Sequence, residues 1–174
     1  MTAPGPVPPP PAPLIDEDSA GFWAAARDGR IALCRCTECR GWLARPLERC
    51  GRCAAPTSFE EVAGAGTIYS YIVVHHASVP AFAHMVPYVI ALVEFDEGPR
   101  LPGILLGERG PAVAIGQQVR AELTAFLGAA EPAVTFRRAG TSPDADSQRL
   151  VPTAARMATG RSQCHLWLRA RRTR

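Results

Sequence analysis

The sequence contains no lysine, since all nineteen of its positive side chains are arginines. This absence excludes any mechanism that needs a lysine nucleophile or a Schiff base. The sequence also lacks an uninterrupted apolar run of about 18 residues, which excludes a conventional membrane-spanning helix. The first thirteen residues contain seven prolines and neither a positively charged start nor an apolar stretch. We therefore expect no secretory signal and a cytoplasmic protein.

The short motifs of several enzyme classes are also absent. There is no G-x-S-x-G nucleophile elbow, no P-loop and no G-x-G-x-x-G dinucleotide fingerprint. His75, His76 and His84 lie in one segment, but their spacing matches no metal motif and no cysteine lies near them. We therefore predict that the protein is not itself an enzyme.

The cysteines are unevenly distributed, because five of the six fall within residues 34–53. In a reducing cytosol, clustered C-x-x-C pairs are more often metal-binding or catalytic than disulfide-bonded. Cys36 and Cys39 form one such pair and Cys50 and Cys53 the other, with ten residues between the pairs. Four thiolates satisfy a tetrahedral Zn²⁺ ion and leave no coordination position open. The spacing predicts a structural zinc site that stabilises the fold and supplies no catalytic water.

The remaining residues of the cysteine-rich segment have simpler interpretations. Cys34 is expected to be a spare thiol, because C-x-C supplies the knuckle geometry less readily than C-x-x-C. Five arginines are expected to offset the negative charge of a zinc tetrathiolate centre, with binding of a phosphate-bearing ligand as the alternative. They are Arg35, Arg40, Arg45, Arg49 and Arg52.

Residues 16–30 are predicted to form a helix of two or three turns. Asp16, Asp18 and Ser19 are candidate N-caps, and Gly29 marks the end. The helix places Phe22 and Trp23 on one face, which either packs within the protein or docks onto a partner. Short strand-like pieces then flank the cysteines; they are "IALCR", "GWLARP" and "SFEEVA".

From Gly64 onward the pattern is that of a β domain. Five runs of strand-like composition are separated by turn signals, at residues 64–76, 87–98, 100–107, 116–126 and 133–138. Such a series favours a small antiparallel barrel, of which the five-stranded OB-fold is the economical choice. The predicted fold class is mainly β, with an N-terminal helix, a zinc ribbon and a five-stranded OB-fold barrel.

The composition divides the chain into four parts. They are a disordered Pro-rich arm (1–15), a helix plus zinc ribbon (16–63), an OB-fold barrel (64–140) and a basic, poorly ordered tail (141–174). Residues 137–174 hold nine arginines against two aspartates, a net of +7, which leaves −4 for residues 1–136. The basic end is either a solvated tail or a contact for an acidic partner or nucleic acid.

Several phrases occur in a characteristic order, namely "ARDGRIAL", "GAGTIYSYIVVHH", "VPY", "LVEFDEGPRL" and "IGQQV". On these phrases, residues 18–140 resemble a bacterial and archaeal zinc-ribbon/OB-fold family, long catalogued as a domain of unknown function and associated with acyl-CoA metabolism. The resemblance implies a rubredoxin-like ribbon with Cys36, Cys39, Cys50 and Cys53 as zinc ligands. Family knuckles often have glycine after the second cysteine, where this chain has Arg40, and this departure is expected to loosen the first knuckle.

The resemblance also implies a function. Family members look like non-catalytic accessory subunits of a thiolase-superfamily enzyme, which is a thiolase, a lipid-transfer-type aldolase or a ketoacyl transferase. A hydratase-like subunit is a further candidate partner, and the small subunit helps to shape the acyl-CoA channel. The expected partner-binding or CoA-binding residues here are Phe22, Trp23, Arg45, His76 and Phe82.

Nucleic-acid binding is the rival hypothesis, because zinc ribbons and OB-folds also occur in proteins that bind nucleic acids. Such proteins combine aromatic stacking platforms with a basic groove. Tyr69 and Tyr71 are expected on one face of the first barrel strand, but no second aromatic pair is evident and residues 1–136 are net acidic. The accessory-subunit hypothesis is therefore preferred.

Overall fold

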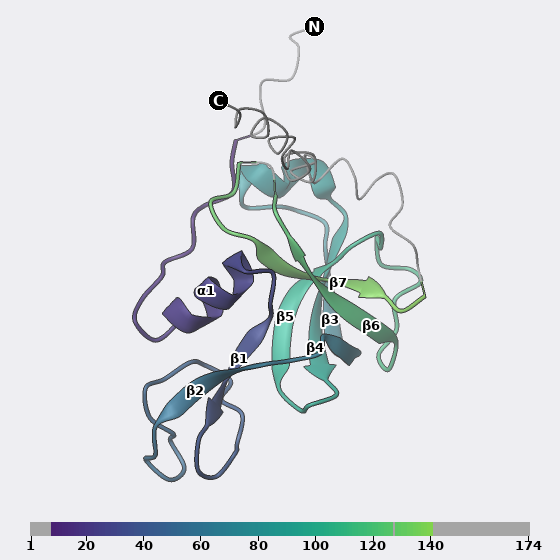
Figure 1. Ribbon diagram of the computed structural model, residues 1–174. Coiled ribbons are helices and arrows are strands. Elements are labelled where there is room, and N and C mark those ends of the chain that lie inside the picture. Colours follow the sequence, from purple (N-terminus) through teal and green to yellow (C-terminus); the bar gives the residue numbers. More distant parts are fainter. Residues whose placement is uncertain (1–7, 127, 141–174) are drawn as a thin grey trace, which may run out of the picture.

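The computed structural model describes residues 8–126 and 128–140, and the predicted basic tail lies outside this range. Figure 1 shows helix α1 and a two-stranded ribbon beside a barrel, which confirms the predicted fold class. The elements are α1 (Ala20–Arg27), β1 (Ala32–Cys36), β2 (Thr57–Glu61), β3 (Ala65–Val74), the 3₁₀ helix η1 (Pro80–Met85), β4 (Tyr88–Phe95), β5 (Arg100–Leu105), β6 (Gln118–Thr124) and β7 (Ala133–Arg138). None of the helices among the described residues is long and apolar enough to cross a membrane.

The barrel strands follow the spatial order β3-β4-β5-β7-β6, and β6 pairs with β3 to close the barrel. All neighbours are antiparallel except β5 and β7, which are parallel. The expectation of a purely antiparallel barrel is corrected here, because β7 inserts between β5 and β6 and runs in the same direction as β5. A five-stranded Greek-key barrel of this kind is an OB-fold.

Alternation along the strands places the apolar core inside the barrel. In β4, Val89, Ala91, Val93 and Phe95 are buried, while the residues between them are only half-buried. Successive side chains of a strand point to opposite faces, so this pattern turns one face of β4 toward the core. The ring of Phe95 meets that of Phe136 from β7, with 6.1 Å between the centroids.

A β-bulge between Ile68 and Ser70 changes the face that β3 turns toward the core. Tyr69 lies in the bulge and is 48% exposed, whereas Tyr71 packs against the core cluster. The expectation that these two tyrosines share one face is therefore wrong. An extra residue in one strand reverses the alternation beyond it, and no residue in this stretch signals the insertion.

Helix α1 is shorter than the predicted range 16–30. Residues before it form a turn, in which the carboxylate of Asp16 accepts a hydrogen bond from the backbone N–H of Ser19 at 2.8 Å. Gly21 lies directly on the ring of Phe59 in β2, and a Cβ at this position would lie 2.2 Å from that ring. The missing side chain therefore allows the helix to pack closely on the ribbon.

The C-terminal turn of α1 is also tied to the barrel. The Nε–H and an NH2 group of Arg27 donate hydrogen bonds to the carboxylate of Glu131, in the connection between β6 and β7. The contact joins residues that are 104 positions apart in the sequence. It places α1 beside the connection that enters the last strand of the barrel.

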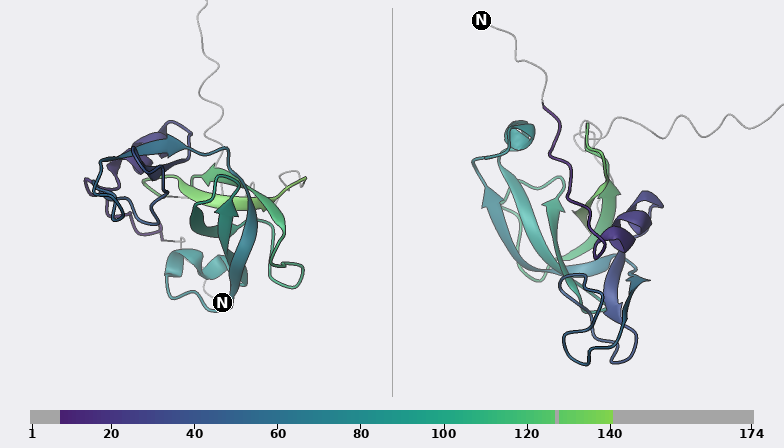
Figure 2. Two further views of the ribbon diagram at one scale, coloured as in Figure 1. Left: turned by 90° about the horizontal axis from the view of Figure 1, so that it is seen from below. Right: turned by 90° about the vertical axis from the view of Figure 1, so that its left-hand side faces the viewer.

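The predicted Pro-rich arm spans residues 1–15, of which the structure describes 8–15. These residues form neither helix nor strand. The right-hand view in Figure 2 shows the segment descending between η1 and the β6–β7 connection toward α1. A Cβ on Gly128 would lie 2.9 Å from Cβ of Pro9, so the arm contacts this connection closely.

Candidate metal centre and partner surface

The four predicted ligands meet at the end of the ribbon that is formed by the two C-x-x-C turns. The Sγ atoms of Cys36, Cys39, Cys50 and Cys53 all lie within 4.8 Å of one another. Cys36 Sγ lies 3.5 Å from Cys53 Sγ, and Cys39 Sγ lies 3.7 Å from Cys50 Sγ. A disulfide requires about 2.05 Å, whereas four thiolates around one tetrahedral ion lie about 3.8 Å apart. The donor set therefore fits a metal ion.

Backbone hydrogen bonds close each of the two turns. The N–H of Cys36 donates to the carbonyl of Gly41 at 3.0 Å, and the N–H of Cys50 donates to the carbonyl of Ala55 at 2.9 Å. Arg40 occupies the glycine position of the first turn with a positive φ of 57°, which is unusual for a non-glycine residue. Its carbonyl accepts a hydrogen bond from Arg35 Nε at 2.8 Å, which holds this conformation.

The same turns favour the thiolate form that a metal ion binds. Burial would raise the pKa of Cys36, but hydrogen bonds from the N–H groups of Glu38 and Cys39, and from neighbouring thiols, lower the pKa to about 6. The N–H of Arg52 lies 3.4 Å from Cys50 Sγ and is the main cause of a lowered pKa at Cys50. Hydrogen bonds to the charged form of a group favour that form. The backbone thus prepares Cys36 and Cys50 as thiolate ligands. At Cys39 the N–H of Gly41 acts in the same direction, but hydrogen bonds with Cys36 and Cys50 outweigh it and raise the pKa to about 11.

Cys34 lies outside the cage, as predicted for a spare thiol. It is buried on β1, and its Sγ lies 3.8 Å from the carbonyl oxygen of Leu47. None of the five described cysteines forms a disulfide. Cys164 lies outside the described residues.

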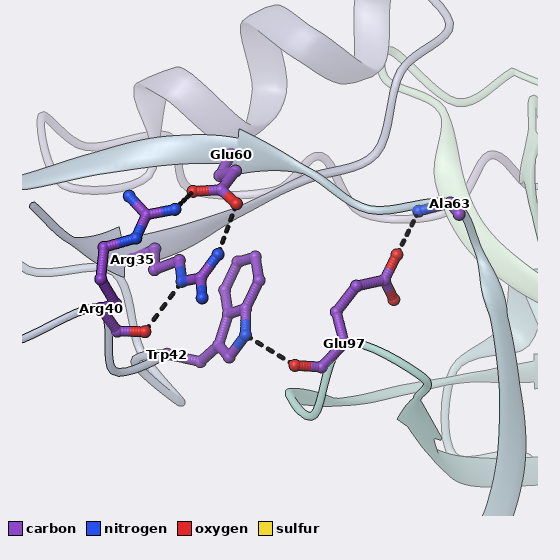
Figure 3. Close-up of polar contacts among 6 residues, drawn as sticks. All are labelled: Arg35, Arg40, Trp42, Glu60, Ala63 and Glu97. Atoms are coloured by element: carbon purple, nitrogen blue, oxygen red, sulfur yellow. Dashed lines mark hydrogen bonds and ion pairs between the residues drawn. The ribbon is translucent and has the colours of Figure 1, made fainter.

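Two of the five nearby arginines are engaged by one carboxylate. Arg35 and Arg40 each donate to Glu60 of β2 at 2.5 Å (Figure 3). Burial would raise the pKa of Glu60, but the two guanidinium groups outweigh burial and lower it. Arg49 donates to the carbonyl of Ala54 at 3.1 Å. These contacts give Arg35, Arg40 and Arg49 structural partners within the ribbon.

Sequence reasoning missed a polar contact between the ribbon and the barrel, which joins Trp42 to Glu97. Trp42 belongs to the predicted strand "GWLARP", but this segment forms only an isolated bridge between Arg35 and Trp42. The indole N–H of Trp42 instead donates to the carbonyl of Glu97 at 2.8 Å (Figure 3). A tryptophan directly after a knuckle is a signal that such a contact exists, although it does not identify the partner.

The expected partner-binding residues separate into two groups. Trp23 and Phe82 come from α1 and η1 and line the same apolar groove, which has a volume of about 330 Å³. Phe22 packs edge-on against Trp23, with 5.0 Å between ring centroids, and also contacts the core. Arg45 and His76 are exposed and do not line the groove. The groove also includes Pro10, Pro13, Ile90, Ile104 and Phe126.

The three histidines of the β3–β4 connection do not join a group of possible metal ligands. His75, His76 and His84 are all exposed. Among the described residues, the four cysteines are the only group of histidine, cysteine or acidic side chains that lie close enough to hold a metal ion. The cage and the groove are thus the two places where most of the predicted site residues meet.

Comparison with known sequences identifies relatives of this arrangement. Residues 59–124 match the family described as the C-terminal OB-fold domain of ChsH2. A probable enoyl-CoA hydratase alpha subunit of Thermomonospora curvata is 41% identical over 113 residues, which cover 63% of this chain and 34% of that protein. A DUF35 domain-containing scaffold protein of Methanocaldococcus jannaschii is 39% identical over 89 residues, which cover 50% of this chain and 62% of that protein.

A third relative is the 3-oxo-4,17-pregnadiene-20-carboxyl-CoA hydratase alpha subunit of Mycobacterium tuberculosis. It is 34% identical over 116 residues, which cover 66% of this chain and 36% of that protein. The chain thus spans about a third of the length of the two hydratase subunits that it matches.

A solved structure covers more of the fold. One chain of the structure titled Ltp2-ChsH2(DUF35) aldolase is 37% identical, with a TM-score of 0.64. The match covers 73% of this chain and 98% of that chain. Because the likeness extends over nearly the whole of that relative, in sequence as well as in fold, the protein belongs to the DUF35 family of ChsH2-like proteins.

Proposed function

We propose that the protein is a non-catalytic accessory subunit of a thiolase-like, CoA-dependent enzyme, and that its cysteine cage holds a structural Zn²⁺ ion. The observation that carries the proposal is the match over 98% of a chain from a structure named for both Ltp2 and ChsH2(DUF35). That name pairs the relative with a second protein in an aldolase. A cytoplasmic location agrees with reduced thiols in the cage.

The chemistry of the described residues supports an accessory role. The cage uses four thiolates, so a bound ion has no open position for a substrate or a water molecule. His75, His76 and His84 are exposed, and no described acidic residue joins them in a cluster. We therefore assign the nucleophile and the base of any reaction to the partner.

The groove of Trp23 and Phe82 is the proposed partner surface. Aromatic side chains that fill or line a pocket are enriched among the residues that dominate binding energy at interfaces. We propose a thiolase-superfamily protein as the partner, with residues 75–87 between β3 and β4 reaching its acyl-CoA channel. A hydratase-like subunit is the second candidate, because the two relatives named as hydratase alpha subunits contain the matched region as one part of a longer chain.

The described barrel offers less support for nucleic-acid binding. The bulge places Tyr69 and Tyr71 on different faces of β3. The guanidinium of Arg100 lies 3.4 Å from the centroid of the Tyr69 ring and covers its face. The pair of stacking aromatics that such binding would use is therefore not assembled on this strand.

Affinity capture tests the proposal. The tagged protein is purified from lysate of its own cells, and the eluate is analysed by mass spectrometry and stained for nucleic acid. We expect a thiolase-like protein in near-equal amount, with acyl-CoA turnover that is lost when the accessory chain is withheld. Recovery of nucleic acid without such a protein would contradict the proposal.

A pair of variants tests the groove itself. Trp23→Ala combined with Phe82→Ala should lower recovery of the partner at least tenfold, because both anchors are removed. Ile115→Ala is the matched control, since Ile115 is an apolar side chain that is 68% exposed and lies outside the groove. Equal loss of the partner in both variants would reject the groove as the specific docking surface.

A further inference from the structure

Glu97, in the turn between β4 and β5, receives hydrogen bonds from two separate parts of the ribbon region (Figure 3). The indole N–H of Trp42 donates to its carbonyl at 2.8 Å, and the backbone N–H of Ala63 donates to its Oε1 at 2.6 Å. Trp42 follows the first C-x-x-C turn, whereas Ala63 lies in the connection from β2 to β3. One barrel residue is thereby bonded both to the segment between the two C-x-x-C turns and to the connection that follows β2.

Backbone hydrogen bonds on both sides of Trp42 fix where it leaves the first C-x-x-C turn, and one of them, from the N–H of Leu43 to the carbonyl of Cys34, spans 3.0 Å. The N–H of Cys36 donates to the carbonyl of Gly41, the residue directly before Trp42. When one ion binds both Cys36 and Cys39, this turn is closed by coordination as well as by the hydrogen bond. The position of the indole is thus linked to metal binding through a segment of a few residues.

A second contact holds the indole from its ring face. The guanidinium carbon of Arg35 lies 4.6 Å from the centroid of the Trp42 ring, and Arg35 directly precedes the ligand Cys36. Arg35 is itself held by Glu60 and by the carbonyl of Arg40. Cation–π contacts of this kind add to the stability of the indole position.

We infer that Trp42 and Glu97 form a clasp through which metal binding at the cysteine cage sets the position of the ribbon on the barrel. The inference rests on the cage binding a metal ion, as proposed above, and not on any partner enzyme. Without the ion, the first turn loses its coordination and Trp42 is released from Glu97. Coupling between two equilibria is reciprocal. If removal of the metal weakens the Trp42–Glu97 clasp by a given factor, then breaking the clasp must weaken metal binding by the same factor.

Amide hydrogen exchange of the full-length protein, with Zn²⁺ bound and after chelation, tests whether removal of the metal opens the clasp. Three amides are compared: Cys50 reports on the cage, Ala63 on the clasp, and Leu106, which donates to Phe136 at 2.7 Å, on the barrel. We expect chelation to accelerate exchange at Cys50 and Ala63 and to leave Leu106 protected. Faster exchange at Cys50 with no change at Ala63 would overturn the inference.

Zn²⁺ affinity, measured by competition with a chromogenic chelator, tests the reciprocal effect, which is whether breaking the clasp weakens metal binding. Trp42→Phe keeps an aromatic ring but removes the donor, and Glu97→Ala removes the acceptor of the Ala63 amide. Because each variant loses about one hydrogen bond, we expect Zn²⁺ binding that is about two- to tenfold weaker. Unchanged affinity in both variants would overturn the inference, as would a wild-type chain that binds no Zn²⁺.

Glu94→Gln is the matched control for these variants. Glu94 lies near the same turn, but its carboxylate accepts from Arg100 at 2.5 Å instead of a ribbon residue. We expect this variant to bind Zn²⁺ as the wild type does. All of these measurements use the protein without a partner, so a failed partner capture leaves their outcome intact.

Discussion

The ribbon and the barrel differ in how much apolar surface each has available to bury. All but one of the largest fully buried side chains belong to the barrel, among them Phe95, Phe136 and Ile68, and the ribbon contributes only Cys36. Burial stabilises the barrel by roughly 25 cal/mol per Å² of apolar surface. The ribbon has instead a four-thiol cage and the ion pairs of Glu60. The same chain therefore uses two main sources of stability, and the ribbon residues Ile31, Leu33 and Val62 also join the core cluster of the barrel.

Removal of the cage should produce the largest difference between the ribbon and the barrel. Replacing Cys36 and Cys50 with serine should abolish metal binding, unfold the ribbon and abolish capture of the partner. Structural zinc supplies about 10–16 kcal/mol of apparent binding free energy in zinc-finger peptides, so this is the largest expected effect. Metal content by elemental analysis and amide exchange in the ribbon and the barrel measure the outcome.

Cys34→Ser is the control for the cage variant, because Cys34 is buried in the same ribbon but lies outside the cage. It should keep one metal ion per chain. A cage variant that assembles with the partner at full affinity without metal would show that the folded ribbon is not needed for docking.

A cavity in the barrel should have the opposite result, because it should lower the stability of the barrel and leave metal binding in the ribbon unchanged. Phe136→Ala removes a fully buried ring from the core and should lower the free energy of unfolding by about 3–5 kcal/mol. At temperatures below the transition, the metal content should not change, since the cage lies in the ribbon. Denaturant unfolding monitored by circular dichroism gives the stability, and loss of metal from the folded variant would contradict this expectation by showing that the cage depends on the barrel core.

Overpacking at Gly21 should loosen the contact between α1 and the ribbon. A Cβ in Gly21→Ala would lie 2.2 Å from the Phe59 ring, and overpacking of this kind costs about 1–3 kcal/mol. The higher helix propensity of alanine offsets about 1 kcal/mol of this cost. Thermal unfolding measures the net loss. Gly51→Ala is the control, because its Cβ would meet no atom within 4 Å, and an equal loss there would contradict the packing explanation.

The ion pairs of Glu60 should give the ribbon a small dependence on pH. The folded pKa of Glu60 lies below its ordinary value of 4.5 because Arg35 and Arg40 favour the carboxylate. The stabilisation is therefore present above about pH 4.5 and is lost as the pH falls through the folded pKa.

A comparison of melting temperatures between the wild type and Glu60→Gln, from pH 7 to pH 3, isolates this effect. Protonation of the cage thiols affects both proteins, so only the difference between them reports on Glu60. We expect the wild-type advantage to shrink toward acidic pH. A difference that stays constant over the whole range would contradict the assignment.

The strands and the cage were predictable from the sequence because each is encoded by local spacing. Two C-x-x-C pairs identify Cys36, Cys39, Cys50 and Cys53, and the structure brings all four together. The run at 133–138 coincides with β7 as observed. Alternation and turn residues determine such elements within a few positions of the chain.

Contacts between distant residues were not predictable in the same way. The parallel pairing of β5 with β7 depends on how the barrel closes, and the bulge at Tyr69 depends on the register of β3 with β4. The bond from Trp42 to Glu97 joins residues 55 positions apart. Each of these features is determined by tertiary packing, which a periodic pattern does not record.

The insertion of β7 between β5 and β6 also determines the order in which the two regions can form during synthesis. The ribbon is complete once Glu61 has been made, so the cage can take up its ion while the barrel strands are still being translated. The barrel cannot close until the strand that ends at Arg138 has emerged, because that strand separates β5 from β6. A nascent chain stalled before β7 should therefore carry a metal-loaded ribbon ahead of an open sheet.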